Sequence, residues 1–220
     1  MSHFVIKICG LRTPSTVDAA LNAGATWIGF NFVPQSVRYI HPATASALVK
    51  QIGDRARTVG LFADTPLETI VDTVRAVPLS MVQLHGQESE AAIGAAKAAV
   101  PGGVIAARGI AAASDLPGPQ TIAPDFYIFD AAPPSDTDVR GGHGTPFDWR
   151  ALTGYRQPTP WLLAGGLTPD NVASAVASVR HIPGFAGVDV ASGVEKARGE
   201  KDAGLIADFV AAARAAMAPL

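Results

Sequence analysis

The sequence predicts an α/β protein, a single closed (β/α)8 barrel that spans residues 1–220. Three observations lead to this fold class. Eight short β-rich runs recur along the 220 residues, alanine-rich amphipathic stretches follow most of them, and 22 glycines and 17 prolines fall between the apolar runs. Each strand-plus-helix unit then has roughly 28 residues, which fits a barrel with short loops. The length fits a single domain of this kind.

The eight predicted strands are nearly continuous apolar segments, as expected for parallel strands covered on both faces. An open doubly wound sheet is the alternative fold, but no Gly-x-Gly-x-x-Gly turn follows the first strand, which weighs against it. The strands are expected at Phe4–Cys9, Trp27–Phe32, Thr58–Phe62, Leu79–Leu84, Gly103–Arg108, Phe126–Asp130, Trp161–Ala164 and Phe185–Val190.

Helix starts follow several of these strands. Thr13 precedes Pro14, Thr168 precedes Pro169, and the run Thr65-Pro66-Leu67-Glu68 has the spacing of a capping box. The fifth and sixth units are weaker, because Ala111–Leu116 is short and the sixth helix has only Asp148 as a candidate N-cap.

Composition excludes several classes of function. The formal charge of −2 provides no basic field for nucleic acid or anionic lipid. The longest stretch without acids or bases, residues 19–37, contains too many polar residues for a membrane helix. The N-terminus lacks the pattern of a secretory signal, and a lone cysteine fits a reducing compartment. We therefore expect a cytoplasmic protein whose partner is a small molecule, with no nucleic acid and no membrane.

Catalytic groups of a (β/α)8 barrel lie at the carboxyl ends of its strands, and two glycine-containing loops there predict a phosphate site. Gly165 and Gly166 follow the seventh strand, where main-chain N–H groups can approach an anion closely. Ser192 and Gly193 repeat this arrangement after the eighth strand. The alternative is that both are simple strand-to-helix turns, but two such turns in the correct units favour phosphate binding.

Cys9 ends the first strand, and Lys7 lies two residues earlier on the same face. A thiol becomes a useful base when a neighbouring cation favours its thiolate, and Lys7 can supply that cation. The alternative is a structural cysteine beside a lysine paired with a carboxylate. Asp189, at the end of the eighth strand, is placed either to contact substrate hydroxyls or to neutralise Lys7.

Asp130 follows an apolar strand, and a carboxyl group at an apolar rim can deliver a proton near neutral pH. Its alternative role is to anchor the next loop. Arg38 can hold a carboxylate in a bidentate manner, or it is a solvated loop arginine. His85 and His143 are candidates for hydrogen bonding, and neither has a neighbour at metal-ligand spacing, so we expect no metal.

Six ordered motifs resemble the phosphoribosylanthranilate isomerase family of tryptophan biosynthesis. Their order and their placement at strand ends carry the resemblance, and Lys201-Asp202 continues it. They are Lys7-Ile8-Cys9-Gly10, Ser36-Val37-Arg38-Tyr39, Val82-Gln83-Leu84-His85-Gly86, Gly141-Gly142-His143-Gly144 with Phe147-Asp148-Trp149, Leu163-Ala164-Gly165-Gly166-Leu167 and Val188-Asp189-Val190-Ala191-Ser192-Gly193-Val194-Glu195.

The resemblance implies an Amadori rearrangement, a cofactor-independent aldose–ketose isomerisation within one molecule. N-(5-phosphoribosyl)anthranilate becomes 1-(2-carboxyphenylamino)-1-deoxyribulose 5-phosphate. By the same resemblance Cys9 matches the general base, Asp130 the general acid and Arg38 the residue that holds the anthranilate carboxylate. The phosphate loops match Gly165, Gly166, Ser192 and Gly193.

Two departures from the family pattern concern loop shape. Val37 stands where the family usually has proline, and His143 where it usually has threonine, with Thr145 and Pro146 also unlike the common continuation. A second hypothesis keeps the same phosphate site but makes the protein a Schiff-base aldolase in which Lys7 has a covalent role. A third hypothesis is a non-catalytic phosphosugar-binding barrel. The sequence leaves open monomer or homodimer, and whether a histidine-pathway aminoaldose is also accepted.

Overall fold

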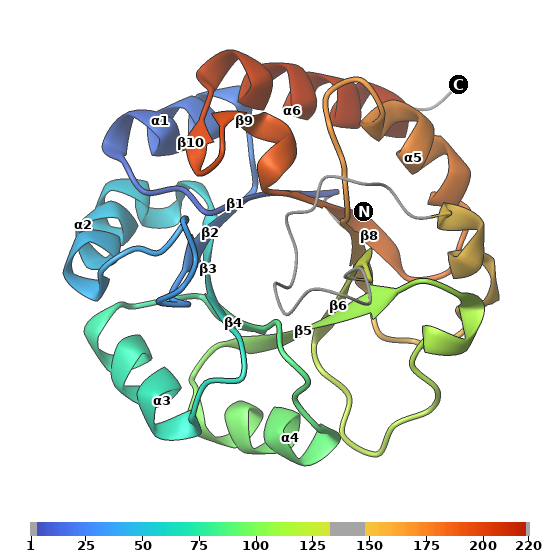
Figure 1. Cartoon of the computed structure of the whole chain (residues 1–220), viewed down its shortest axis with the longest axis horizontal. Coiled ribbons are helices and arrows are strands. Elements are labelled where there is room, and N and C mark those ends of the chain that lie inside the picture. Colours follow the sequence, from blue (N-terminus) through green and yellow to red (C-terminus); the bar gives the residue numbers. More distant parts are fainter. Residues whose placement is uncertain (1–3, 133–147, 219–220) are drawn as a thin grey trace.

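Eight parallel strands close into a barrel in the computed structural model, which describes residues 4–132 and 148–218. Each strand pairs with its neighbours in sequence, and β1 pairs with β8 to close the ring (Figure 1). The predicted barrel is confirmed, and the open sheet is wrong. The strands are β1 (Val5–Cys9), β2 (Trp27–Asn31), β3 (Arg57–Phe62), β4 (Met81–Leu84), β5 (Gly103–Ile110), β6 (Phe126–Ala131), β7 (Trp161–Leu163) and β8 (Phe185–Val190).

Helices surround the barrel as an outer ring (Figure 1). The α-helices are α1 (Pro14–Ala23), α2 (Pro42–Ile52), α3 (Leu67–Ala76), α4 (Glu90–Ala99), α5 (Val172–Val179) and α6 (Ala203–Met217). Short 3₁₀ turns occur at Gly53–Arg55, Ala113–Asp115, Trp149–Gly154 and Ser192–Val194, and a small hairpin, β9 (Glu195–Ala197) with β10 (Glu200–Lys201), precedes α6. None of the helices within 4–132 and 148–218 has the length and apolar character needed to cross a bilayer.

Two of the predicted helix starts agree with the structure. Thr13 caps α1 by accepting a hydrogen bond from the N–H of Thr16, with Pro14 in the first turn. Asp148 accepts from the N–H of Arg150, but the element that it begins is a 3₁₀ turn.

At the other two predicted starts a helix forms, but its cap or its first residue differs from the prediction. The Thr65 hydroxyl donates to the carbonyl of Ala63, so α3 begins at Leu67 without a capping box. After β7, the Asn171 side chain accepts from the N–H of Thr168 and donates to the Gly166 carbonyl, which holds this segment as a turn. For this reason α5 begins at Val172, later than the Thr168-Pro169 signal predicts.

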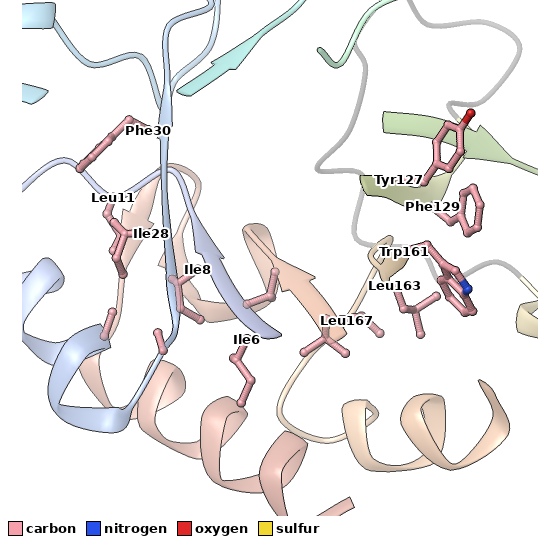
Figure 2. Close-up of a cluster of buried hydrophobic side chains, with 14 of the residues drawn as sticks. Ile6, Ile8, Leu11, Ile28, Phe30, Tyr127, Phe129, Trp161, Leu163 and Leu167 are labelled. Atoms are coloured by element: carbon pink, nitrogen blue, oxygen red, sulfur yellow. The ribbon is translucent and has the colours of Figure 1, made fainter. Parts of the chain in front are cut away.

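Side chains of the strands alternate between two cores. Ile6 and Ile8 point outward from β1 into the large apolar layer beneath the helices, part of which is drawn in Figure 2. Val5 points inward into a smaller cluster within the barrel. By the period of two along a strand, Lys7 and Cys9 share this inward face with Val5. The inner face therefore carries apolar residues at one end and polar residues toward the carboxyl ends of the strands.

Candidate active site

Lys7 lies inside the barrel and is fully buried. Its Nζ atom donates to Asp189 Oδ1 at 2.9 Å, because Lys7 and Asp189 are partners in the β1–β8 register. Burial favours the neutral amine, but the negative charge of Asp189 and the hydrogen bond to it oppose this, and the pKa of Lys7 is raised. Of the two roles expected for Asp189, the structure shows the neutralisation of Lys7.

Cys9 is the next inward residue on β1, and its thiol is buried. Gly29 is its partner on β2, and a Cβ atom at Gly29 would lie 2.9 Å from Cys9 Sγ, so glycine makes room for the sulfur. Burial raises the pKa of Cys9, while the positive charges of Lys7 and Lys201 work in the opposite direction. The predicted effect of Lys7 on the thiol is present, but in the free protein burial outweighs it.

Arg38 lies next to Cys9 and not in solvent. A Cβ atom on Gly10, which follows Cys9, would lie 2.9 Å from Arg38 Cδ. The guanidinium forms a bidentate pair with Glu195, in which Nε donates to Oε1 at 2.6 Å and Nη2 donates to Oε2 at 2.8 Å. The interpretation of Arg38 as a solvated loop residue is wrong, since its side chain is 13% exposed.

Glu195 is the centre of this second charge cluster. Lys201 Nζ donates to Glu195 Oε1 at 2.9 Å and to the Ala191 carbonyl at 2.7 Å, and the N–H of Gly199 donates to Glu195 Oε2. Burial opposes ionisation of Glu195, but the hydrogen bonds from Arg38 and the charge of Lys201 lower its pKa to about 2. Burial also lowers the pKa of Lys201.

Asp130 ends the inward face of β6, two residues beyond Ile128 of the inner cluster. Its Oδ1 atom accepts from the N–H of Ala131 at 2.8 Å, and its Oδ2 atom lies 3.4 Å from His85 Nε2. Gln83 Nε2 lies 2.8 Å from His85 Nδ1. Gln83 therefore holds the His85 ring from the side opposite to the nitrogen that faces Asp130.

The two glycine loops lie against each other. Gly165 and Gly166 have φ angles of +82° and +65°, which glycine adopts without strain. A Cβ atom on Gly193 would overlap the carbonyl oxygen of Leu167, so the loops after β7 and β8 are in contact. Ser192 begins the 3₁₀ turn after β8. This geometry brings together the residues predicted to bind phosphate, and phosphate binding itself stays a prediction.

The site residues therefore form two groups at the carboxyl ends of the strands. Cys9 lies with Arg38 beside β1 and β8, while Asp130 lies with His85 across the barrel at β4 and β6, next to the loop after β7. His143, Thr145 and Pro146 lie outside the described residues. Val37 is exposed and packs on Gly199 of the hairpin.

Sequence reasoning missed the partner of Arg38. The sequence shows Glu195, Lys201 and Gln83 only as members of the quoted motifs and indicates no role for them. The one available signal was that Glu195 directly follows the predicted phosphate loop, at the same end of the barrel as Arg38. Within 4–132 and 148–218, no group of three or more His, Cys, Asp or Glu side chains is arranged to hold a metal ion.

The environment of Lys7 bears on the Schiff-base hypothesis. An amine must be neutral and reachable to attack a carbonyl. Lys7 has no exposed surface, is paired with Asp189 and has a raised pKa, so it is held as an ammonium ion. These observations weigh against an aldolase that uses this lysine.

Comparisons with known proteins agree on one family. A family model described as N-(5'phosphoribosyl)anthranilate (PRA) isomerase matches residues 6–212. The N-(5'-phosphoribosyl)anthranilate isomerase of Nitrobacter winogradskyi is 45% identical over 215 residues, which cover 96% of this chain and 93% of that protein.

Solved structures lead to the same family. The crystal structure of TrpF from Jonesia denitrificans is 37% identical with a TM-score of 0.82, covering 99% of this chain and 100% of that one. A phosphoribosyl anthranilate isomerase in complex with reduced 1-(o-carboxyphenylamino)-1-deoxyribulose 5-phosphate is 29% identical with a TM-score of 0.77, covering 96% of this chain and 99% of that one.

Proposed function

This chain belongs to the N-(5'-phosphoribosyl)anthranilate isomerase family of tryptophan biosynthesis, and on that premise we propose that Asp130 and Cys9 are its general acid and general base. The observation that carries the proposal is their common position. Both lie on the inner face of the barrel at the carboxyl ends of their strands, one on β6 and one on β1. A sugar held between them exposes opposite sides to an acid and a base.

Asp130 starts the reaction by protonating the ribose ring oxygen. The C1′–oxygen bond then breaks, and the anthranilate nitrogen shares its electron pair with C1′ to form a protonated Schiff base. The contact between His85 and Oδ2 and the hydrogen bond from Ala131 to Oδ1 hold the carboxyl group in place for this transfer. An acid placed in this way contributes roughly 10²- to 10⁴-fold in rate.

Cys9 completes the reaction by removing the proton from C2′. The positive charge of the Schiff base acidifies that proton, and the electrons of the C–H bond neutralise the iminium to give an enolamine, which tautomerises to the ketone. Burial keeps Cys9 protonated in the free protein. The positive charge of the Schiff base, together with the charges of Lys7 and Lys201, favours the thiolate. We therefore place thiolate formation after ring opening.

The two anionic ends of the substrate fix it between these groups. In this proposal the N–H groups around Gly165, Gly166 and Gly193 and the Ser192 hydroxyl bind the phosphate, and Arg38 binds the anthranilate carboxylate. C1′ is reduced while C2′ is oxidised within one molecule, so the proton transfers need no cofactor. We further propose a single-domain enzyme that acts in the cytoplasm, because its substrate is a phosphorylated metabolic intermediate.

The test follows the loss of the phosphoribosylanthranilate fluorescence with purified protein and no added cofactor. We expect turnover by the wild-type protein and at least a hundredfold lower kcat for Cys9→Ala. Circular dichroism should show the same fold for both proteins. Near-wild-type turnover by Cys9→Ala would remove the base from this mechanism.

A borohydride control separates the isomerase from the aldolase hypothesis. Borohydride reduces a protein-bound Schiff base to a stable amine, so it would trap an aldolase intermediate on Lys7. We expect no adduct on Lys7 by mass spectrometry after treatment with substrate and borohydride. An adduct there, with turnover lost, would contradict the proposed chemistry.

A further inference from the structure

We propose that Glu195 is a positioning residue for substrate specificity, which orients the Arg38 guanidinium toward the carboxylate of the substrate's aromatic ring. The inference rests on the proposed function of Arg38 and extends it to a residue that touches no substrate itself. Glu195 lies outside the predicted acid, base and phosphate groups. It is nevertheless joined by hydrogen bonds to Arg38, in the loop after β2, and to Gly199 and Lys201 of its own hairpin.

The contacts of Glu195 define one orientation for Arg38. Both carboxylate oxygens accept from the guanidinium, at 2.6 Å from Nε and 2.8 Å from Nη2, the geometry of a bidentate pair. Lys201 and the N–H of Gly199 hold the same two oxygens from the other side, at 2.9 Å each. Because four donors fix the carboxylate, the carboxylate in turn fixes the plane of the guanidinium.

This orientation leaves a free edge on Arg38. The hydrogen bonds use Nε and one proton of Nη2, and within the described part of the chain Nη1 has no hydrogen-bond partner. The Arg38 stem lies over Gly10, directly after Cys9. Arg38 is therefore anchored beside the residue that we propose as the base, and a ring carboxylate bound to its remaining N–H groups would lie on the same side of the barrel mouth as Cys9.

A charge effect and an orientation effect of Glu195 would change the affinity for an anionic ligand in opposite directions. Arg38 and Lys201 supply two positive charges and Glu195 supplies one negative charge. Replacing Glu195 by glutamine removes the negative charge, so attraction for an anionic ligand would increase if charge alone mattered. If orientation matters, the same substitution weakens binding of a carboxylate, because the guanidinium is released.

The experiment compares two ligands that differ only in the carboxylate. One is reduced 1-(o-carboxyphenylamino)-1-deoxyribulose 5-phosphate, and the other is the same compound with an unsubstituted phenyl ring. We expect calorimetry to show at least tenfold weaker binding of the first ligand to Glu195→Gln than to wild type. Binding of the second should change less than twofold, because it does not use Arg38.

A matched control lies on the same hairpin. Glu200 forms an exposed pair with Lys196 at 3.1 Å, and Glu200→Gln removes one charge from the same small sheet. We expect that variant to bind both ligands as wild type does. Equal weakening of both ligands by Glu195→Gln would mean that Glu195 merely supports the neighbouring phosphate loop. Unchanged or tighter binding of the carboxylate ligand would also overturn the proposal.

A double-mutant cycle keeps the inference apart from the proposed catalysis. In the Arg38→Ala background, Glu195→Gln should cause no further loss of affinity for the carboxylate ligand, because its effect acts through Arg38. Additive losses would contradict the inference. Turnover is measured separately, so an inactive wild-type protein that still shows this coupling would contradict the proposed function alone.

A nitrogen-15 spectrum tests the orientation of Arg38 without any ligand, so it applies even if neither ligand binds. The Arg38 Nε–H signal should be protected from exchange in wild type and Glu200→Gln, and lost in Glu195→Gln. Protection that persists in Glu195→Gln would overturn the orienting role whatever the protein binds. If Glu195→Gln does not fold, Glu195→Asp, whose shorter side chain keeps the charge, takes its place, and we expect the same direction of change.

Discussion

The two sides of the barrel mouth are held in contrasting ways. Beside β1 and β8, Lys7, Arg38 and Lys201 each donate to a carboxylate, at 2.9, 2.6 and 2.9 Å. Beside β4 and β6, the side-chain ion pair that Asp130 forms within residues 4–132 and 148–218 is with His85, at 3.4 Å. The first side is held by short, buried ion pairs between side chains, whereas the pair between Asp130 and His85 on the second side is longer.

Binding a ligand and transferring a proton place different demands on the geometry of a side chain. A guanidinium that holds a ligand benefits from being oriented beforehand, because the cost of ordering it is then met during folding. A carboxyl group that transfers a proton must change its hydrogen bonds during the reaction. We infer that the β1–β8 side contributes mainly to binding and stability, and the β4–β6 side mainly to the barrier of the reaction.

The sharpest test of this contrast is Asp130→Asn. An amide cannot give up a proton, so we expect kcat to fall by roughly 10²- to 10⁴-fold. The free energy of unfolding should change by less than about 1 kcal/mol, because asparagine keeps the shape of the side chain. Steady-state kinetics measures kcat, and urea unfolding measures the free energy of unfolding. A large loss of stability with kcat retained would mean that the β4–β6 side contributes to stability and not to catalysis.

The opposite side is tested by Lys7→Met. This change leaves Asp189 buried without its partner, which costs about 3 to 5 kcal/mol in the free energy of unfolding. Lys196→Met is the control, since its pair with Glu200 has side chains 56% and 61% exposed, and such pairs contribute about 1 kcal/mol or less. Equal losses in urea unfolding would show that burial does not distinguish the two ion pairs.

The ion pairs of Glu195 should make the free energy of unfolding depend on pH. The pKa of Glu195 is lowered from 4.5 to about 2, so its contribution is fully present above pH 4.5 and is lost as pH falls toward 2. This shift corresponds to about 3 kcal/mol. We expect the stability difference between wild type and Glu195→Gln to shrink by about that amount across this range, and a difference independent of pH would contradict the pairing.

The smallest expected effect concerns the space around the thiol. Gly29→Ala would place a Cβ atom 2.9 Å from Cys9 Sγ, and overpacking of this kind costs about 1 to 3 kcal/mol. Gly118→Ala is the control, because a Cβ atom there meets nothing within 4 Å. Thermal unfolding of both variants checks this, and equal melting temperatures would mean that the β1–β2 contact can relax.

Local sequence signals predicted some elements well and others poorly. Thr13 and Pro14 predicted the start of α1 because the cap depends only on neighbouring residues. The same kind of signal at Thr65 located α3 but not its cap, because the Thr65 hydroxyl bonds to Ala63 and the helix begins at Leu67 without a side-chain cap. After β7, the Asn171 side chain bonds back to Thr168 and Gly166 and delays the helix, which residue-by-residue preference does not reveal.

The candidate site divides in the same way. The positions of Cys9 and Asp130 at strand ends follow from local sequence, since each closes an apolar run, and the period of two then places them inside the barrel. The partners of Arg38 and Lys7 depend on the folded chain, because Glu195 is 157 residues from Arg38 and Asp189 is 182 residues from Lys7 in the sequence. Pairing at such separations depends on the closure of the barrel between β1 and β8, which no local pattern encodes.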